Sequence, residues 1–294
     1  MPDASTQTEQ DIAPTRKPIS DATKKKYDQA IKRIEDAKLD LDKPKEVIAW
    51  IKTKGEGSAQ KTYLSAIKYH LGARPKPFYF PKEYQDEIDR LFGRQSEKDT
   101  NQELSAKQVE NFVPYDELLE VQKRLADKDK TKESDWKKYV IASLYTLNAP
   151  VRADYGEVKV FGRGDTRRTT GNELIWRKKK PVFIFRDYKT SKDYGAVTIP
   201  LSKELTSVIG EWFAHLGKVP KYLLDDKLTP NALLGHIEDT FVSTGKKVGI
   251  NILRHAYIKH HLPAIATNTN KRQELATRML HSVERQQVYF PQNA

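Results

Sequence analysis

The stretch Met279-Leu280-His281-Ser282-Val283-Glu284-Arg285-Gln286-Gln287-Val288-Tyr289-Phe290 lies near the end of the chain, and Asn251-Ile252-Leu253-Arg254-His255 precedes it. The earlier stretch contains a leucine-arginine-histidine run. The later one contains a histidine-serine pair and, eight residues after that histidine, a tyrosine. Each piece alone is a weak signal, because such runs occur by chance, and Tyr289 can also be explained as an aromatic side chain that packs on a last helix. Residues upstream therefore decide what the two stretches mean.

Two upstream groups add cationic side chains. Pro150-Val151-Arg152-Ala153-Asp154-Tyr155 follows the apolar stripe of a predicted helix and precedes a segment, 157–161, that alternates as a short strand does. Lys189-Thr190-Ser191-Lys192-Asp193-Tyr194-Gly195 stands between two runs of β-branched and aromatic residues, 182–185 and 196–200. Such runs around a polar turn predict a hairpin with lysines at its tip.

Taken together, these residues resemble the catalytic domain of the tyrosine recombinases, the integrase family that shares its chemistry with type IB topoisomerases. The Pro-x-Arg-x-Asp-Tyr and Tyr-Lys-Thr-x-Lys-x-Tyr-Gly forms look like the branch carried by eukaryotic DNA viruses and virophage-like elements. The resemblance implies a mainly α fold with a small antiparallel β-sheet. It also implies a two-domain clamp around DNA, formed by an N-terminal helical core-binding domain and a mixed α+β catalytic domain.

The resemblance further implies an active site made of Arg152, Lys189, Arg254, His281 and Tyr289. Two guanidinium groups can hold the non-bridging oxygens of a pentavalent phosphorane in a fork geometry that lysine cannot reproduce. Tyr289 would attack and form a 3′-phosphotyrosine, Lys189 would protonate the leaving 5′-oxygen, and His281 would donate to the scissile phosphate. This chemistry requires no ATP, metal or other cofactor.

Two positions leave alternatives open. Lys192 competes with Lys189 for the role of general acid, since the distance back from the end of the second run fits Lys192 better in some bacterial relatives. Asn251 stands three residues before Arg254, where the family often has histidine, and an asparagine cannot accept the tyrosine proton. The expected function is a site-specific recombinase or integrase. The alternatives are a type IB topoisomerase and a DNA-binding relative with weakened catalysis.

Composition supports a polyanionic partner. Lys and Arg exceed Asp and Glu by 52 to 40 in the 294 residues, a formal net charge of +12, which favours nucleic acid. We expect double-stranded DNA as the partner, with self-assembly into dimers or tetramers on it, as the resemblance implies. No stretch approaches the roughly 18 apolar residues of a membrane span, so we expect no membrane partner and an intracellular location, in the host nucleus or cytoplasm if the protein is viral.

The order of the patterns predicts a disordered tail (1–16), a helical core-binding domain (17–93), a linker (94–112) and a catalytic domain (113–294). Exposed basic residues of the helical domain and of a charged loop, 162–180, are expected to contact DNA phosphates, and the alternative is a solvated charged face. These candidates are Lys24, Lys25, Lys26, Lys61, Lys68, Arg163, Arg167 and Arg168.

Metal chemistry is not expected. The chain has no cysteine, which excludes disulfides and thiolate metal sites. His255, His260 and His261 lack the paired spacing with an intervening glutamate that zinc peptidases use.

Overall fold

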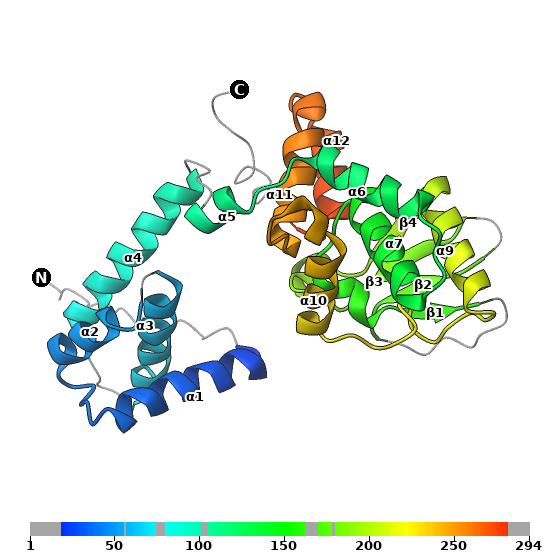
Figure 1. Cartoon of the computed structure of the whole chain (residues 1–294). Coiled ribbons are helices and arrows are strands. Elements are labelled where there is room, and N and C mark those ends of the chain that lie inside the picture. The colour runs from blue at the N-terminus through cyan, green and yellow to red at the C-terminus, as the bar shows by residue number, and fades with distance from the viewer. Residues whose placement is uncertain are drawn as a thin grey trace, which may run out of the picture. The chain divides into compact units, whose positions relative to one another are not determined.

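The computed structural model describes residues 19–55, 57–74, 80–100, 105–162, 170–177 and 180–281, except for the side chains of 94–100. The chain divides into two compact units, Met1–Lys98 and Asp99–Ala294, here called unit 1 and unit 2. Helices predominate in the described part of both units, and the described strands form one small sheet in unit 2 (Figure 1).

In its described residues unit 1 is helical, as predicted, and contains α1 (Asp21–Asp36), α2 (Pro44–Lys52), α3 (Ser58–Leu71) and α4 (Lys82–Thr100). The hydroxyl of Ser20 caps α1 by accepting a hydrogen bond from the N–H of Thr23 at 3.2 Å. The apolar faces meet in one core around the fully buried Ile34. The hydroxyl of buried Tyr84 donates to the carbonyl of Leu41 at 3.1 Å, which fastens α4 to the turn before α2.

The segment 94–112, predicted as a linker, is largely helical where it is described. Helix α4 extends into this segment, and α5 (Ala106–Glu110) follows with a capping box between Ser105 and Gln108. A polar composition does not distinguish an irregular linker from an exposed helix, and no proline interrupts 94–100. The separation of two domains by this segment stays a prediction.

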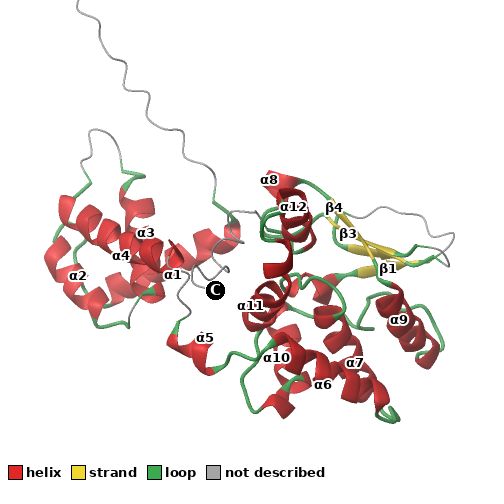
Figure 2. Cartoon of the chain, turned by 90° about the horizontal axis from the view of Figure 1, so that it is seen from above, coloured by secondary structure: helices red, strands yellow, loops and turns green. Residues whose placement is uncertain are grey.

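Unit 2 is built around α7. Its described helices of more than one turn are α5, α6 (Tyr115–Asp127), α7 (Glu133–Thr146), α9 (Lys203–His215), α10 (Pro230–Thr240), α11 (Ile250–His261) and α12 (Thr269–Arg278). Every residue from Tyr139 to Thr146 is buried, because α6, α9 and α10 all pack against α7. Figure 2 shows the sheet on one side of these helices. The helix predicted before Pro150 is confirmed as α7.

The sheet corrects two sequence-based predictions. Its strands, β1 (Lys159–Phe161), β2 (Glu173–Ile175), β3 (Val182–Phe185) and β4 (Val197–Pro200), follow chain order. The β3–β4 hairpin is antiparallel as predicted, but β1 pairs with β2 in parallel, so the sheet is mixed and not antiparallel. Strand β2 also lies in the segment predicted as a charged loop. Three residues are too few to show alternation, and residue patterns carry no information on strand direction.

No described helix combines the length and the apolar character that crossing a membrane requires.

Candidate active site

Arg152 follows the end of α7 and stands immediately before η1 (Ala153–Glu157). Its backbone is held from both sides. The N–H donates to Oδ2 of Asp154 at 3.1 Å, and the carbonyl accepts from the hydroxyl of buried Tyr145 at 2.8 Å. The half-buried side chain extends to the C-terminal part of unit 2, where Nη1 donates to the carbonyl of Leu280 at 3.1 Å. Arg152 therefore has a fixed backbone and contacts the stretch that precedes Tyr289.

Arg254 lies on α11 and is only 1% exposed. Its Nη1 donates to the carbonyl of Pro150 at 2.7 Å and to the carbonyl of Met279 at 3.0 Å. A buried guanidinium is unfavourable unless its donors find acceptors, and these two carbonyls supply acceptors for Nη1. The acceptors come from the segment before Arg152 and from the turn after α12. Arg254 thus connects the motif that begins at Pro150 with the C-terminal stretch that begins at Met279.

The residues Met279, Leu280 and His281 form the C-terminal turn of α12. The N–H of Leu280 donates to the carbonyl of Thr277 at 3.0 Å, and the N–H of His281 donates to the carbonyl of Ala276 at 3.1 Å. This Schellman arrangement requires a left-handed residue at its centre, and Leu280 has φ 54° where glycine is usual. Burial of the leucine side chain offsets the conformational cost. The turn presents consecutive carbonyls to the two arginines.

The β3–β4 connection carries both lysines considered as the general acid. Lys189 is exposed in the turn before α8 (Ser191–Tyr194), and Lys192 is exposed on α8. The hydroxyl of Thr190 donates to the carbonyl of Leu280 at 3.3 Å, the same carbonyl that accepts from the first arginine. Thr190, the residue after Lys189, therefore donates to the same carbonyl as Arg152.

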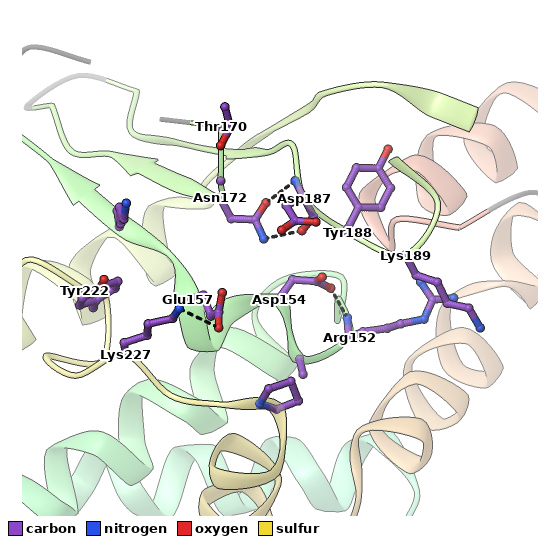
Figure 3. Close-up of a pocket in the computed structure, with 14 residues that line it drawn as sticks. Arg152, Asp154, Glu157, Thr170, Asn172, Asp187, Tyr188, Lys189, Tyr222 and Lys227 are labelled. Atoms are coloured by element: carbon purple, nitrogen blue, oxygen red, sulfur yellow. Dashed lines mark hydrogen bonds and ion pairs between the residues drawn. The ribbon is translucent and has the colours of Figure 1, made fainter. Parts of the chain in front are cut away.

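Arg152 and Lys189 line the same cavity of about 580 Å³, which we call the Lys189 cavity (Figure 3). Lys192 is not among the described residues that line it. The other charged residues that line this cavity are three carboxylates and two lysines, namely Asp154, Glu157, Asp187, Lys159 and Lys227. Burial raises the pKa of the Asp154 carboxyl above its ordinary value, while the nearby Arg152 guanidinium opposes that shift. Of the two lysines, Lys189 is the one that shares a surface with Arg152.

Arg152 also lines a second cavity of about 420 Å³, which we call the Asn251 cavity. Asn251 is exposed in the first turn of α11, whose N-cap residue, Gly249, makes no side-chain hydrogen bond. Lys107 and Lys247 line the same cavity. Glu238 also lines it and pairs with Lys247 at 3.5 Å, so Lys107, Arg152 and the N-terminal end of the helix are the groups that would favour an anion. Asn251 and Arg152 therefore share a positively charged surface within unit 2.

His255, next to Arg254, contacts α5 rather than a metal site. Its Nε2 lies 3.0 Å from Nε2 of Gln108, so the amide donates and the imidazole accepts as a neutral ring. Burial, and to a smaller extent the Arg254 guanidinium, lower the pKa of His255 to about 4. Within the described residues, no cluster of three or more His, Cys, Asp or Glu side chains could hold a metal ion.

We expect His255 to make the stability of unit 2 depend on pH. The unfolded chain binds a proton near pKa 6.5, but the folded His255 binds one only near 4, so acidification through this range favours unfolding. The separation corresponds to at most about 3 kcal/mol. Denaturant unfolding of the wild type and of His255→Gln, at neutral and mildly acidic pH, measures this contribution. An equal loss of stability in both proteins would assign the effect to other groups.

The candidate DNA contacts of unit 1 differ in their surroundings. Lys24–Lys26 are exposed at the start of α1. Lys68 is exposed on α3 and donates to Oε1 of Gln85 at 3.0 Å. Lys61 is half-buried, with its Nζ 5.3 Å from the ring centroid of Phe92. The lysines of α1 and Lys68 are therefore more exposed than Lys61, and DNA contact by any of them stays a prediction.

Four predicted residues lie outside the described part of the chain, namely Arg163, Arg167, Arg168 and Tyr289. The structure also adds three residues that sequence reasoning missed. Thr190 belongs to the hairpin motif, in which only the lysines drew attention, and Leu280 stands at a position where glycine would have signalled the turn. Asn172 lines the Lys189 cavity and carries no recognisable sequence signal.

No protein-family model matches the chain, and no curated protein matches it either. Solved structures that resemble the chain include two recombinases. The crystal structure of XerA recombinase shares 16% identity over 92% of this chain and 87% of that chain, with a TM-score of 0.42. The XerH site-specific recombinase bound to its difH substrate, in a pre-cleavage complex, shares 12% identity over 92% of this chain and 87% of that chain, with a TM-score of 0.48. Likenesses at these levels do not establish function.

Proposed function

We propose that the protein is a site-specific DNA recombinase or integrase that cleaves and rejoins DNA through a 3′-phosphotyrosine on Tyr289, without a metal or ATP. One observation carries the proposal. Arg152 and Arg254, which are far apart in sequence, donate to the consecutive carbonyls of Leu280 and Met279. Both guanidinium groups therefore meet at the backbone that leads to the proposed nucleophile.

In the proposed cleavage step, the hydroxyl oxygen of Tyr289 attacks the phosphorus of the scissile phosphodiester and loses its proton to water. The bond from phosphorus to the 5′-oxygen breaks, and that oxygen keeps the electron pair and takes a proton from the Lys189 ammonium group. Arg152 stabilises a non-bridging oxygen of the phosphorane. Rejoining is the reverse, since the 5′-hydroxyl of another strand attacks and the tyrosine leaves. The phosphoester bond is conserved throughout, so no ATP is consumed.

Arg254 and His281 take part from buried positions, with exposed fractions of 1% and 5%. Arg254 holds the carbonyls of Pro150 and Met279, and so fixes the backbone that supports Arg152. In the proposal both side chains contact a phosphate oxygen when DNA binds. Asn251, in its own cavity beside Arg152, would hydrogen-bond a phosphate oxygen without acting as a base.

The proposed partner is double-stranded DNA, which the net charge of +12 and the exposed lysines of α1 support. Assembly of dimers or tetramers on DNA, action in a host nucleus or cytoplasm, and kinship with the viral branch are further parts of the proposal. The last of these depends on the residue forms at 150–155 and 188–195 alone.

Strand exchange distinguishes a recombinase from a topoisomerase. We expect a monomer in solution that forms dimers and larger complexes on duplexes carrying the terminus of its own genetic element, and that exchanges strands between two labelled duplexes. Sedimentation of the complexes and denaturing gels of the products measure both properties. Strictly monomeric complexes on every DNA, together with efficient relaxation of unrelated supercoiled plasmids and no exchanged product, would identify a topoisomerase instead.

A further inference from the structure

Asn172 makes three hydrogen bonds to the backbone just after β3. Its Nδ2 donates to the carbonyl of Asp187 at 2.8 Å, and its Oδ1 accepts from the N–H groups of Arg186 and Asp187, both at 3.0 Å. The side chain is 6% exposed, so these partners replace water for both ends of the amide. Among short side chains only an amide offers a donor and an acceptor on one planar group.

These bonds hold the chain where the sheet no longer does. The β2–β3 pairing ends at Ile184, and the β3–β4 pairing ends at Phe185. Arg186 and Asp187 therefore lie beyond the paired part of the sheet. Beyond the Asn172 contacts, the hydroxyl of buried Tyr188 donates to the carbonyl of Gly195 at 2.8 Å. Asn172 therefore fixes the point at which the chain leaves the sheet.

Lys189 lies between two anchors. The Asn172 contacts hold residues 186 and 187 before it, and the Thr190 hydroxyl after it donates to the carbonyl of Leu280. Figure 3 shows the Asn172 amide directed at the backbone of Asp187, with Tyr188 and Lys189 following along the same loop. Fixing both sides restricts where the Lys189 ammonium group can lie relative to Arg152.

We propose that Asn172 is a positioning residue that holds the 186–190 loop so that Lys189 meets the leaving 5′-oxygen. This inference rests on the proposed function. A misplacement of about 1 Å in a reacting group can cost about 10²-fold in rate. Asn172→Ala, which removes all three bonds, is therefore expected to slow DNA cleavage about 10²-fold.

The alternative is that Asn172 only stabilises the fold. A substrate with a different leaving group distinguishes this structural role from positioning of Lys189. A 5′-bridging phosphorothioate has a sulfur leaving group that departs without a proton, so it bypasses the general acid. If Asn172 acts through Lys189, Asn172→Ala recovers most of its rate on the sulfur substrate, as Lys189→Ala does. The double variant should then be no slower on the natural phosphodiester than Lys189→Ala alone.

Asn148→Ala is the matched control. Asn148 is also a buried asparagine of unit 2, and its amide donates to the Tyr155 hydroxyl at 3.1 Å and accepts from Nη2 of Arg278 at 3.0 Å. It does not contact the 186–190 loop through these bonds, so sulfur should not restore its rate. If Asn172→Ala does not fold, Asn172→Asp keeps the acceptor for both N–H groups and replaces the donor to Asp187 by a charged oxygen that repels that carbonyl, and the same recovery is expected of it.

The possible failures are distinguishable. An equal loss on both substrates for a folded Asn172 variant, a multiplicative loss in the double variant, or no loss at all would each overturn the positioning role. Failure of sulfur to restore Lys189→Ala would overturn the general-acid assignment, and the positioning role with it. Absence of cleavage by the wild type on its own DNA would overturn the proposed function itself.

Discussion

Tyr289→Phe is expected to bind DNA as well as the wild type and to form no covalent adduct. The substitution removes only the hydroxyl oxygen that would attack phosphorus, and it keeps the aromatic ring for any packing role. No activated nucleophile then remains at this position, so the expected loss of adduct is complete. Denaturing gels of a labelled nicked duplex measure the adduct, and fluorescence anisotropy of the same duplex measures binding.

Tyr194→Phe provides a matched control, because Tyr194 is a 51% exposed tyrosine on α8 whose hydroxyl has no role in the proposed step. This variant should form adducts at the wild-type rate. An adduct that persists in Tyr289→Phe would place the nucleophile elsewhere and remove the basis for assigning the C-terminal stretch.

Arg254→Ala is expected to lose both stability and cleavage. The substitution leaves the carbonyls of Pro150 and Met279 without their buried donor, and each unsatisfied group costs about 1 to 3 kcal/mol. We therefore expect the free energy of unfolding to fall by about 2 to 6 kcal/mol. Cleavage by the folded fraction should fall about 10² to 10³-fold, as for loss of a preorganised charge.

Two variants separate these effects. Arg152→Ala should lose cleavage by a similar factor but less stability, because Arg152 is half-buried and its described side-chain bond is to one carbonyl. Arg254→Lys keeps the charge but not the planar fork, so it should remain impaired. Wild-type cleavage by folded Arg254→Ala would reduce Arg254 to a structural role, and unchanged stability would show that the carbonyl contacts contribute little. Denaturant unfolding and single-turnover cleavage measure the two quantities.

Most helices of this fold could be predicted from the sequence, because each long helix places an apolar stripe at helical spacing. The helix α7 shows the limit of this approach, since it is buried on nearly every side and its environment comes from α6, α9 and α10. The strand β2 was missed because three residues carry too little pattern. The parallel pairing of β1 with β2 depends on the path of the chain between them, which residue types do not encode.

The candidate site was predictable as a set of residue types and less so as a set of contacts. The motifs singled out Arg152, Arg254 and the hairpin lysines, and the shared cavity favours Lys189 over Lys192. The burial of Arg254 was not foreseen, because its acceptors are backbone carbonyls that any residue could supply. The same holds for Asn172, whose partners are backbone groups of a loop that follows a different strand.

The most direct test of the account is to trap the covalent intermediate of the wild-type protein and locate it. A duplex nicked just beyond the scissile phosphate releases its short 5′-hydroxyl fragment and prevents religation, so the intermediate accumulates. Proteolysis and mass spectrometry of the adduct should then place the DNA on Tyr289, joined through its 3′-phosphate. The proposed 3′-phosphotyrosine on Tyr289 would be contradicted by attachment to another residue or through a 5′-phosphate. Cleaved DNA without any attached protein would contradict it as well.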